Sequence, residues 1–186
     1  HPSDDARVLA GQGTAALELV EQAGPFDAVI APVSGGGLLS GTAIATHGLD
    51  PGVRVLGGEP AQAADAHASL RRGALVTDII PDTIADGLRA QLCARTYAIL
   101  RAHAVEVLLA GEDGIVAAMR LVWDRLKLVV EPSGAVALAA LIAGREGVAG
   151  LRIGVILSGG NVDLDRLPWQ EPRFQRGLPP AAGGIA

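Results

Sequence analysis

The sequence comprises 186 residues, of which 49% are hydrophobic and only 3% aromatic, and its formal net charge is −5. This length and apolar content suffice for one globular domain with an aliphatic core. An acidic chain with few aromatic rings lacks the basic face and the stacking surfaces that nucleic-acid binding requires, so a small-molecule ligand is the better expectation. Charges and Gly/Pro breakers interrupt every apolar run, which predicts no membrane span.

Single residues add three expectations. Cys93 is the only cysteine, which excludes an intrachain disulfide and a cysteine-cluster zinc site and is typical of a cytoplasmic protein. The first residue is His1 rather than Met, so we expect a piece of a longer protein. Lys127 is the only lysine, so lysine chemistry has one candidate in this chain.

The pattern along the chain alternates between amphipathic helices and short, wholly apolar strands. Such strands separated by helices indicate an α/β fold with a parallel twisted sheet covered by helices on both faces. Beyond position 165 the sequence becomes rich in Pro and Gly, which predicts one domain over 1–165 and a disordered tail over 166–186. The expected helices are 14–22, 38 onward, 62–72, 96–103, 112–126 and 134–143, and the expected strands are 28–33, 53–58, 105–109 and 153–157.

A glycine loop, Ser34-Gly35-Gly36-Gly37, stands between the first predicted strand and the helix that follows. Ligands of parallel sheets bind at the carboxyl ends of strands, where N–H groups at a helix start attract anions. Glycines let these amides approach a phosphate closely, and Ser34 adds a hydroxyl donor. A simple tight turn fits the loop equally well. A second glycine turn, 158–161, also follows a strand, so both loops could converge at one edge of the sheet.

Two nucleotide-binding patterns fit less well. A Walker A loop needs Gly-Lys-Ser/Thr, but Leu38-Leu39 stands where its lysine would be, which disfavours nucleoside triphosphate hydrolysis. A dinucleotide fingerprint needs its third glycine at position 40, where this chain has Ser40, although Glu59 has about the spacing of a ribose-binding carboxylate.

Four motifs together resemble, in order and spacing, the serine/threonine dehydratases and serine racemases, which are pyridoxal-phosphate enzymes of fold type II. The opening His1-Pro2 and the stretch 10–14 resemble this family too, so the resemblance extends to about Asp165. It implies the C-terminal part of the large, cofactor-binding domain of that fold. The motifs are Ala31–Leu38 (APVSGGGL), Thr83–Gly87 (TIADG), Glu131–Ala135 (EPSGA) and Leu157–Asp163 (LSGGNVD).

The resemblance also implies roles for individual residues. Ser158 would hydrogen-bond the pyridine nitrogen, and a neutral hydroxyl there suits β-elimination better than transamination because it does not hold that nitrogen protonated. Glu131 would lie near the cofactor ring, and Asn161 would shape the same loop. The residues implied to cradle the cofactor phosphate are Ser34, Gly35, Gly36, Gly37 and Leu38.

A divalent-cation site is implied at Glu59, Asp65 and the carbonyl of Ala63, because serine racemase-like members hold a cation there. Oxygen ligands of this kind suit Mg²⁺ or Ca²⁺. The alternative for the same residues is that Glu59 caps a turn and Asp65 is a solvated helix residue.

The family's Schiff-base lysine and its substrate-carboxylate loop do not occur in this chain, and in the family both precede the matched part. Lys127 corresponds to a non-catalytic lysine and is expected to be a surface charge. The intact enzyme is implied to be a homo-oligomer that deaminates L-threonine or L-serine to a 2-oxo acid and ammonia, or that racemises serine. The chain alone is expected to be inactive and marginally stable. A non-catalytic domain that binds a phosphate-bearing ligand or a partner is the alternative of another class.

Overall fold

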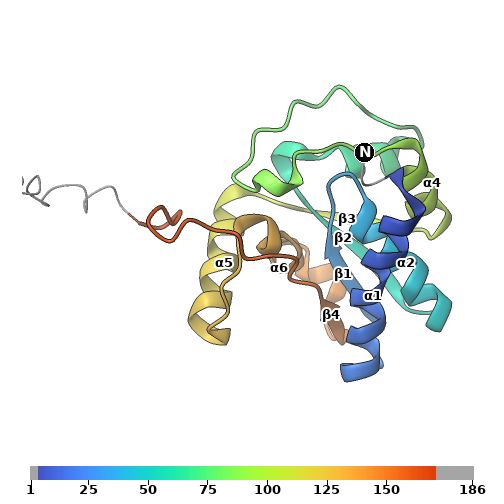
Figure 1. The fold of residues 1–186 in the computed structure, drawn as a ribbon, viewed down its shortest axis with the longest axis horizontal. Coiled ribbons are helices and arrows are strands. Elements are labelled where there is room, and N and C mark those ends of the chain that lie inside the picture. The colour runs from blue at the N-terminus through green and yellow to red at the C-terminus, as the bar shows by residue number, and fades with distance from the viewer. Residues whose placement is uncertain (1–3, 171–186) are drawn as a thin grey trace, which may run out of the picture.

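The computed structural model describes residues 4–170, which form a four-stranded parallel sheet of strand order β3-β2-β1-β4 with helices on both faces (Figure 1). This architecture confirms the predicted α/β class. Within residues 4–170, no helix is both long and apolar enough to cross a membrane. The strands are β1 (Ala28–Pro32), β2 (Arg54–Pro60), β3 (Glu106–Ala110) and β4 (Ile153–Val155), and the helices are α1 (Ala6–Ala23), α2 (Gly37–Leu49), α3 (Asp65–Arg72), α4 (Ala94–Ala102), α5 (Glu112–Leu126) and α6 (Pro132–Ala143).

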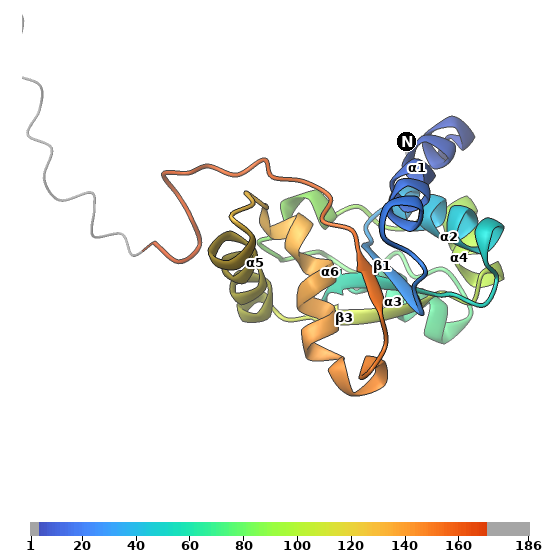
Figure 2. The ribbon, with the colours of Figure 1, turned by 90° about the horizontal axis from the view of Figure 1, so that it is seen from below.

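Strand β1 is buried along its whole length because both faces of the sheet are covered. Its side chains alternate between the two faces. Ile30 packs with Leu56 and with α6, whereas Ala31 packs with Leu39 of α2. Figure 2 shows the same division, with α1, α2 and α4 on one side of the sheet and α5 and α6 on the other.

Helix α1 begins eight residues before the expected start at position 14. Its N-cap is Asp5, whose carboxylate accepts the Arg7 N–H at 2.9 Å. Gly11 and Gly13 weaken the helical pattern in the sequence, but Gly13 is needed for packing, because a Cβ atom there would lie 2.9 Å from the Gly41 carbonyl oxygen. A Cβ atom on Gly41 of α2 would lie 2.5 Å from the Leu9 carbonyl oxygen and 2.6 Å from the Gly13 nitrogen. The small residues therefore allow α1 and α2 to lie backbone against backbone.

The C-terminal segment packs beyond the predicted boundary at 165. Leu167 lies against the hydrophobic cluster beneath α5 and α6. The ring of Trp169 meets Trp123 edge to face, with centroids 5.4 Å apart. The rest of the predicted tail, 171–186, lies outside the described residues.

Candidate functional site

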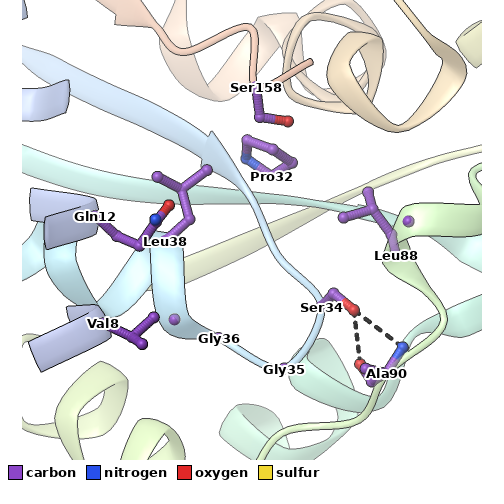
Figure 3. Close-up of a pocket in the computed structure, with 12 residues that line it drawn as sticks. Val8, Gln12, Pro32, Ser34, Gly35, Gly36, Leu38, Leu88, Ala90 and Ser158 are labelled. Carbon is purple, nitrogen blue, oxygen red and sulfur yellow. Dashed lines mark hydrogen bonds between the residues drawn. The ribbon is translucent and has the colours of Figure 1, made fainter. Parts of the chain in front are cut away.

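A cavity of about 400 Å³ opens at the carboxyl ends of β1 and β4 (Figure 3). These strands are parallel neighbours, with Ile30 paired to Val155, so the loops that follow them leave the sheet at the same edge. The structure thereby brings the two glycine loops of the sequence to one site. The lining residues are Val8, Gln12, Pro32, Ser34, Gly35, Gly36, Gly37, Leu38, Gly87, Leu88, Ala90 and Ser158.

Helix α2 begins at this cavity, and its first backbone N–H groups have no carbonyl of a preceding helical turn to bond with. The Ser40 N–H donates to the Gly36 carbonyl at 2.9 Å, so the amides of Gly37, Leu38 and Leu39 precede this intrahelical bond. The helix dipole adds positive potential at the same end. This end of α2 is therefore suited to an anion such as a phosphate group.

Gly36 is required at the turn into α2 for two reasons. Its φ of +86° lies in the left-handed region that favours glycine. A Cβ atom there would lie 2.7 Å from the Leu92 Cδ2 and equally close to the Thr96 Cβ. The loop is thus pressed against the segment that leads into α4, and no larger residue fits.

The sequence led us to expect that the Ser34 hydroxyl donates its proton to a ligand in the cavity. In the structure this proton points elsewhere. The hydroxyl donates to the Ala90 carbonyl at 2.9 Å and accepts the Ala90 N–H at 3.0 Å (Figure 3). A hydroxyl has one proton, and here the backbone of Ala90 takes it. Ser34 therefore ties the glycine loop to the 86–92 segment, and what remains for an anion at this position is its backbone N–H.

Ser158 lines the cavity near Pro32 (Figure 3), whereas Glu131 and Asn161 are not among the residues of the cavity wall. The Glu131 N–H donates to the Gly159 carbonyl at 3.1 Å, and a Cβ atom on Gly159 would overlap the Glu131 carboxylate. Burial and the charge of Asp86 raise the pKa of Glu131, while the Asn161 backbone N–H lowers it. These two residues hold the Ser158 loop in place.

Glu59 and Asp65 form a second polar site, at the end of β2. Both Glu59 oxygens accept backbone N–H groups of α3, from Ala66 and His67, each at 2.8 Å. Asp65 accepts the Leu92 N–H at 2.9 Å. Glu59 is only 1% exposed and Asp65 only 4%, so the idea of Asp65 as a solvated residue is wrong, whereas Glu59 does act as a cap.

The charge balance at this second site suits a cation. Burial raises the pKa of Glu59 to about 8, the two backbone N–H groups oppose this, and the charge of Asp65 adds to it. Burial also raises the pKa of Asp65. The salt bridges found between residues 4 and 170 include neither carboxylate. In the same residues no cluster of three or more His, Cys, Asp or Glu side chains occurs, so a cation here would need backbone or water oxygens as further ligands.

The two sites share one segment of chain. The Asp65 carboxylate accepts the Leu92 N–H, and the Leu92 side chain lies against Gly36. The Ser34 hydroxyl accepts the Ala90 N–H of the same segment. A change at the acidic pair would therefore reach the glycine loop through residues 90–92.

Several cavity residues were not singled out from the sequence. Gly87, Leu88 and Ala90 enter it from the 86–92 segment, for which the TIADG motif was the available signal. Val8 and Gln12 lie on the part of α1 that was not expected to be helical. Lys127 is exposed at the C-terminus of α5 and does not line the cavity, in agreement with its expected role as a surface charge.

The parallel sheet, the glycine loop at a helix start and the cavity between two strand ends define an α/β domain that binds an anionic cofactor. A family model described as "Pyridoxal-phosphate dependent enzyme" matches residues 1–159, and the chain belongs to this family. Its fold is that of the fold type II enzymes.

Similar proteins have related activities in their names. The chain is 49% identical to a beta-hydroxyaspartate dehydratase of Paracoccus denitrificans over 91% of this chain and 54% of that protein. It matches the structure of maize serine racemase with a TM-score of 0.85 and 42% identity, over 88% of this chain and 52% of that one. It matches the crystal structure of a T.th. threonine deaminase with a TM-score of 0.80 and 46% identity, over 86% of this chain and 60% of that one. The chain thus spans about half the length of the curated relatives that it matches.

Proposed function

We propose that this chain is the phosphate-binding part of a pyridoxal-phosphate enzyme that eliminates water from a β-hydroxy-α-amino acid and yields a 2-oxo acid and ammonia. The observation that carries the proposal is the cavity in which the start of α2 meets Ser158. L-Serine and L-threonine are the substrates implied by the motifs, and a 49% identical relative is named for hydroxyaspartate. All three carry the β-hydroxyl that such an elimination expels.

The chain's own residues would bind and orient the cofactor. The residues that would cradle its phosphate are Ser34, Gly35, Gly36, Gly37 and Leu38, and Ser158 would face its pyridine nitrogen. When bound, the cofactor supplies the electron sink that stabilises negative charge at the substrate's α-carbon. A serine hydroxyl leaves the pyridine nitrogen unprotonated, which moderates that sink. Glu131 and Asn161 would hold the Ser158 loop so that the Ser158 hydroxyl stays next to the cofactor ring.

Two further assignments belong to the same proposal. Glu59, Asp65 and the Ala63 carbonyl would bind Mg²⁺ or Ca²⁺, which would neutralise the two buried carboxylates. The lysine that bonds to the cofactor aldehyde would come from the part of the relatives' length that this chain does not span. By itself the chain would then bind cofactor without turning over substrate.

A racemase is the second candidate, supported by the similarity to maize serine racemase. Removal and return of the α-proton would use the same cofactor site, so the residues described here fit both reactions. A non-catalytic phosphate-binding domain is the candidate of another class.

The test uses the full-length protein with pyridoxal phosphate, and supplies L-serine, L-threonine and 3-hydroxyaspartate in turn. Formation of a 2-oxo acid with equimolar ammonia is the expected result. Formation of the D-enantiomer without a 2-oxo acid would show that the protein is a racemase and not a lyase. Cofactor binding with neither product, and with no adduct after borohydride reduction, would leave the non-catalytic domain. A reduced adduct located at Lys127 by mass spectrometry would contradict the surface role of that lysine.

A further inference from the structure

We infer that Thr96 is a positioning residue for the phosphate site, because its hydroxyl binds the Gly35 carbonyl and so keeps this oxygen directed away from the cavity in which an anion would bind. The inference rests on the proposed function, since it requires that a phosphate group binds at the start of α2. Thr96 does not line the cavity, and it acts through the backbone of the glycine loop.

The hydroxyl of Thr96 is completely buried and joins two segments that are 61 residues apart in sequence. It donates to the Gly35 carbonyl at 2.9 Å and accepts the Cys93 N–H at 3.2 Å. The Cys93 carbonyl is also within reach, at 3.2 Å, but it already accepts the Tyr97 N–H at 2.9 Å. The single hydroxyl proton is therefore best assigned to Gly35, which is the nearer acceptor.

The direction of the Gly35 carbonyl decides whether an acceptor of the glycine loop faces the cavity, which Gly35 and Gly36 both line. The first bond of α2 runs from the Ser40 N–H to the Gly36 carbonyl, and Gly36 has left-handed backbone angles, so the Gly35 carbonyl takes no part in the helix. The bond from Thr96 keeps the Gly35 oxygen directed at the buried start of α4. Without this bond, the oxygen could turn toward the cavity.

The same arrangement removes a repulsion. A carbonyl oxygen carries partial negative charge, so an oxygen turned toward the cavity would oppose a bound phosphate. Contact between Gly36 and Thr96 restricts the loop further, because even a Cβ atom on Gly36 would lie 2.7 Å from the Thr96 Cβ. Shape and hydrogen bonding thus act together, and substitutions can separate them.

The experiment compares Thr96→Val, which keeps the shape and loses the hydroxyl, with Thr96→Ser, which keeps the hydroxyl and loses the methyl group. Dissociation constants for pyridoxal phosphate and for pyridoxal, which lacks the phosphate, are measured calorimetrically on the full-length protein. Thr96→Val should weaken pyridoxal phosphate binding by roughly 3- to 10-fold, the equivalent of one net hydrogen bond. Pyridoxal binding should stay within about twofold of wild type, and Thr96→Ser should bind both ligands within about twofold of wild type.

Equal weakening for both ligands in Thr96→Val would show a merely structural role, and no weakening for either would show no role; both results overturn the inference. Failure of the wild-type protein to bind pyridoxal phosphate would instead overturn the proposed function, and with it this inference.

Discussion

Glu59 makes the stability of this protein depend on pH and on divalent cations in a specific way. Its pKa is raised to about 8, chiefly by burial, from an ordinary value of 4.5. The neutral carboxyl is therefore favoured in the folded state. For an acid with a raised folded pKa, the stabilising effect is complete below the unfolded pKa and is lost as pH rises through the folded pKa. In metal-free protein, stability should fall between about pH 4.5 and 8 because of this residue.

The size of the effect follows from the same values. A displacement from 4.5 to about 8 corresponds to at most about 5 kcal/mol for ionising Glu59 in place. A cation that binds the ionised form opposes this cost. At a concentration 100-fold above its dissociation constant it adds about 2.7 kcal/mol. For a domain of this size that is a rise in Tm of roughly 5 to 10 °C.

Thermal unfolding would be followed by circular dichroism at pH 6 and pH 8, with chelator or with Mg²⁺ or Ca²⁺. The comparison is between wild type, Glu59→Gln and the control Glu18→Gln, which changes an exposed carboxylate on α1. In chelator, wild type and the control should lose stability from pH 6 to pH 8, and Glu59→Gln should lose less. The cation should stabilise wild type and the control at pH 8 but not Glu59→Gln. Identical pH and cation responses in all three proteins would refute both the buried-acid argument and the metal site.

Two further predictions concern helix packing and a histidine pair. Gly41→Ala should lower the free energy of unfolding by about 1–3 kcal/mol in urea titrations, because the new methyl group would lie 2.5 Å from the Leu9 carbonyl. Gly48→Ala in the same helix, with open space around it, should be neutral or stabilising by up to about 1 kcal/mol, and equal losses in the two variants would contradict the close contact. His103 Nδ1 lies 2.8 Å from His47 Nδ1, and burial followed by the charge of His47 lowers the pKa of His103. The stability that His103 contributes is present above its unfolded pKa of 6.5 and is lost as pH falls. Between pH 7.5 and 5.5, wild type should therefore lose more stability than His103→Gln in urea titrations. Parallel curves of stability against pH would contradict this.

Much of the architecture follows from local pattern. Apolar runs such as Ala28–Pro32, separated by amphipathic helical segments, favour a parallel sheet covered on both faces, because that arrangement buries both sides of each strand. The glycine loop at 34–37 could also be located, because a strand followed by glycines and a helix places backbone amides at a sheet edge. The start of α1 was not predictable in this way, because Gly11 and Gly13 resemble helix breakers, and the contact of Gly13 with α2 is known only from the structure.

The sequence by itself determined the fold class, the family resemblance and the residues that could meet a phosphate group. Only the tertiary structure decided what those residues do, because the answer lies in contacts between distant segments. The Ser34 hydroxyl donates to the carbonyl of Ala90, 56 positions away, and the Gly35 carbonyl accepts the proton of the Thr96 hydroxyl. Asp65 is buried rather than solvated because α3 packs beneath the 90–92 segment. Hydrogen-bond direction and burial depend on which segments of the chain meet in space, and the periodicity of the sequence does not contain this information.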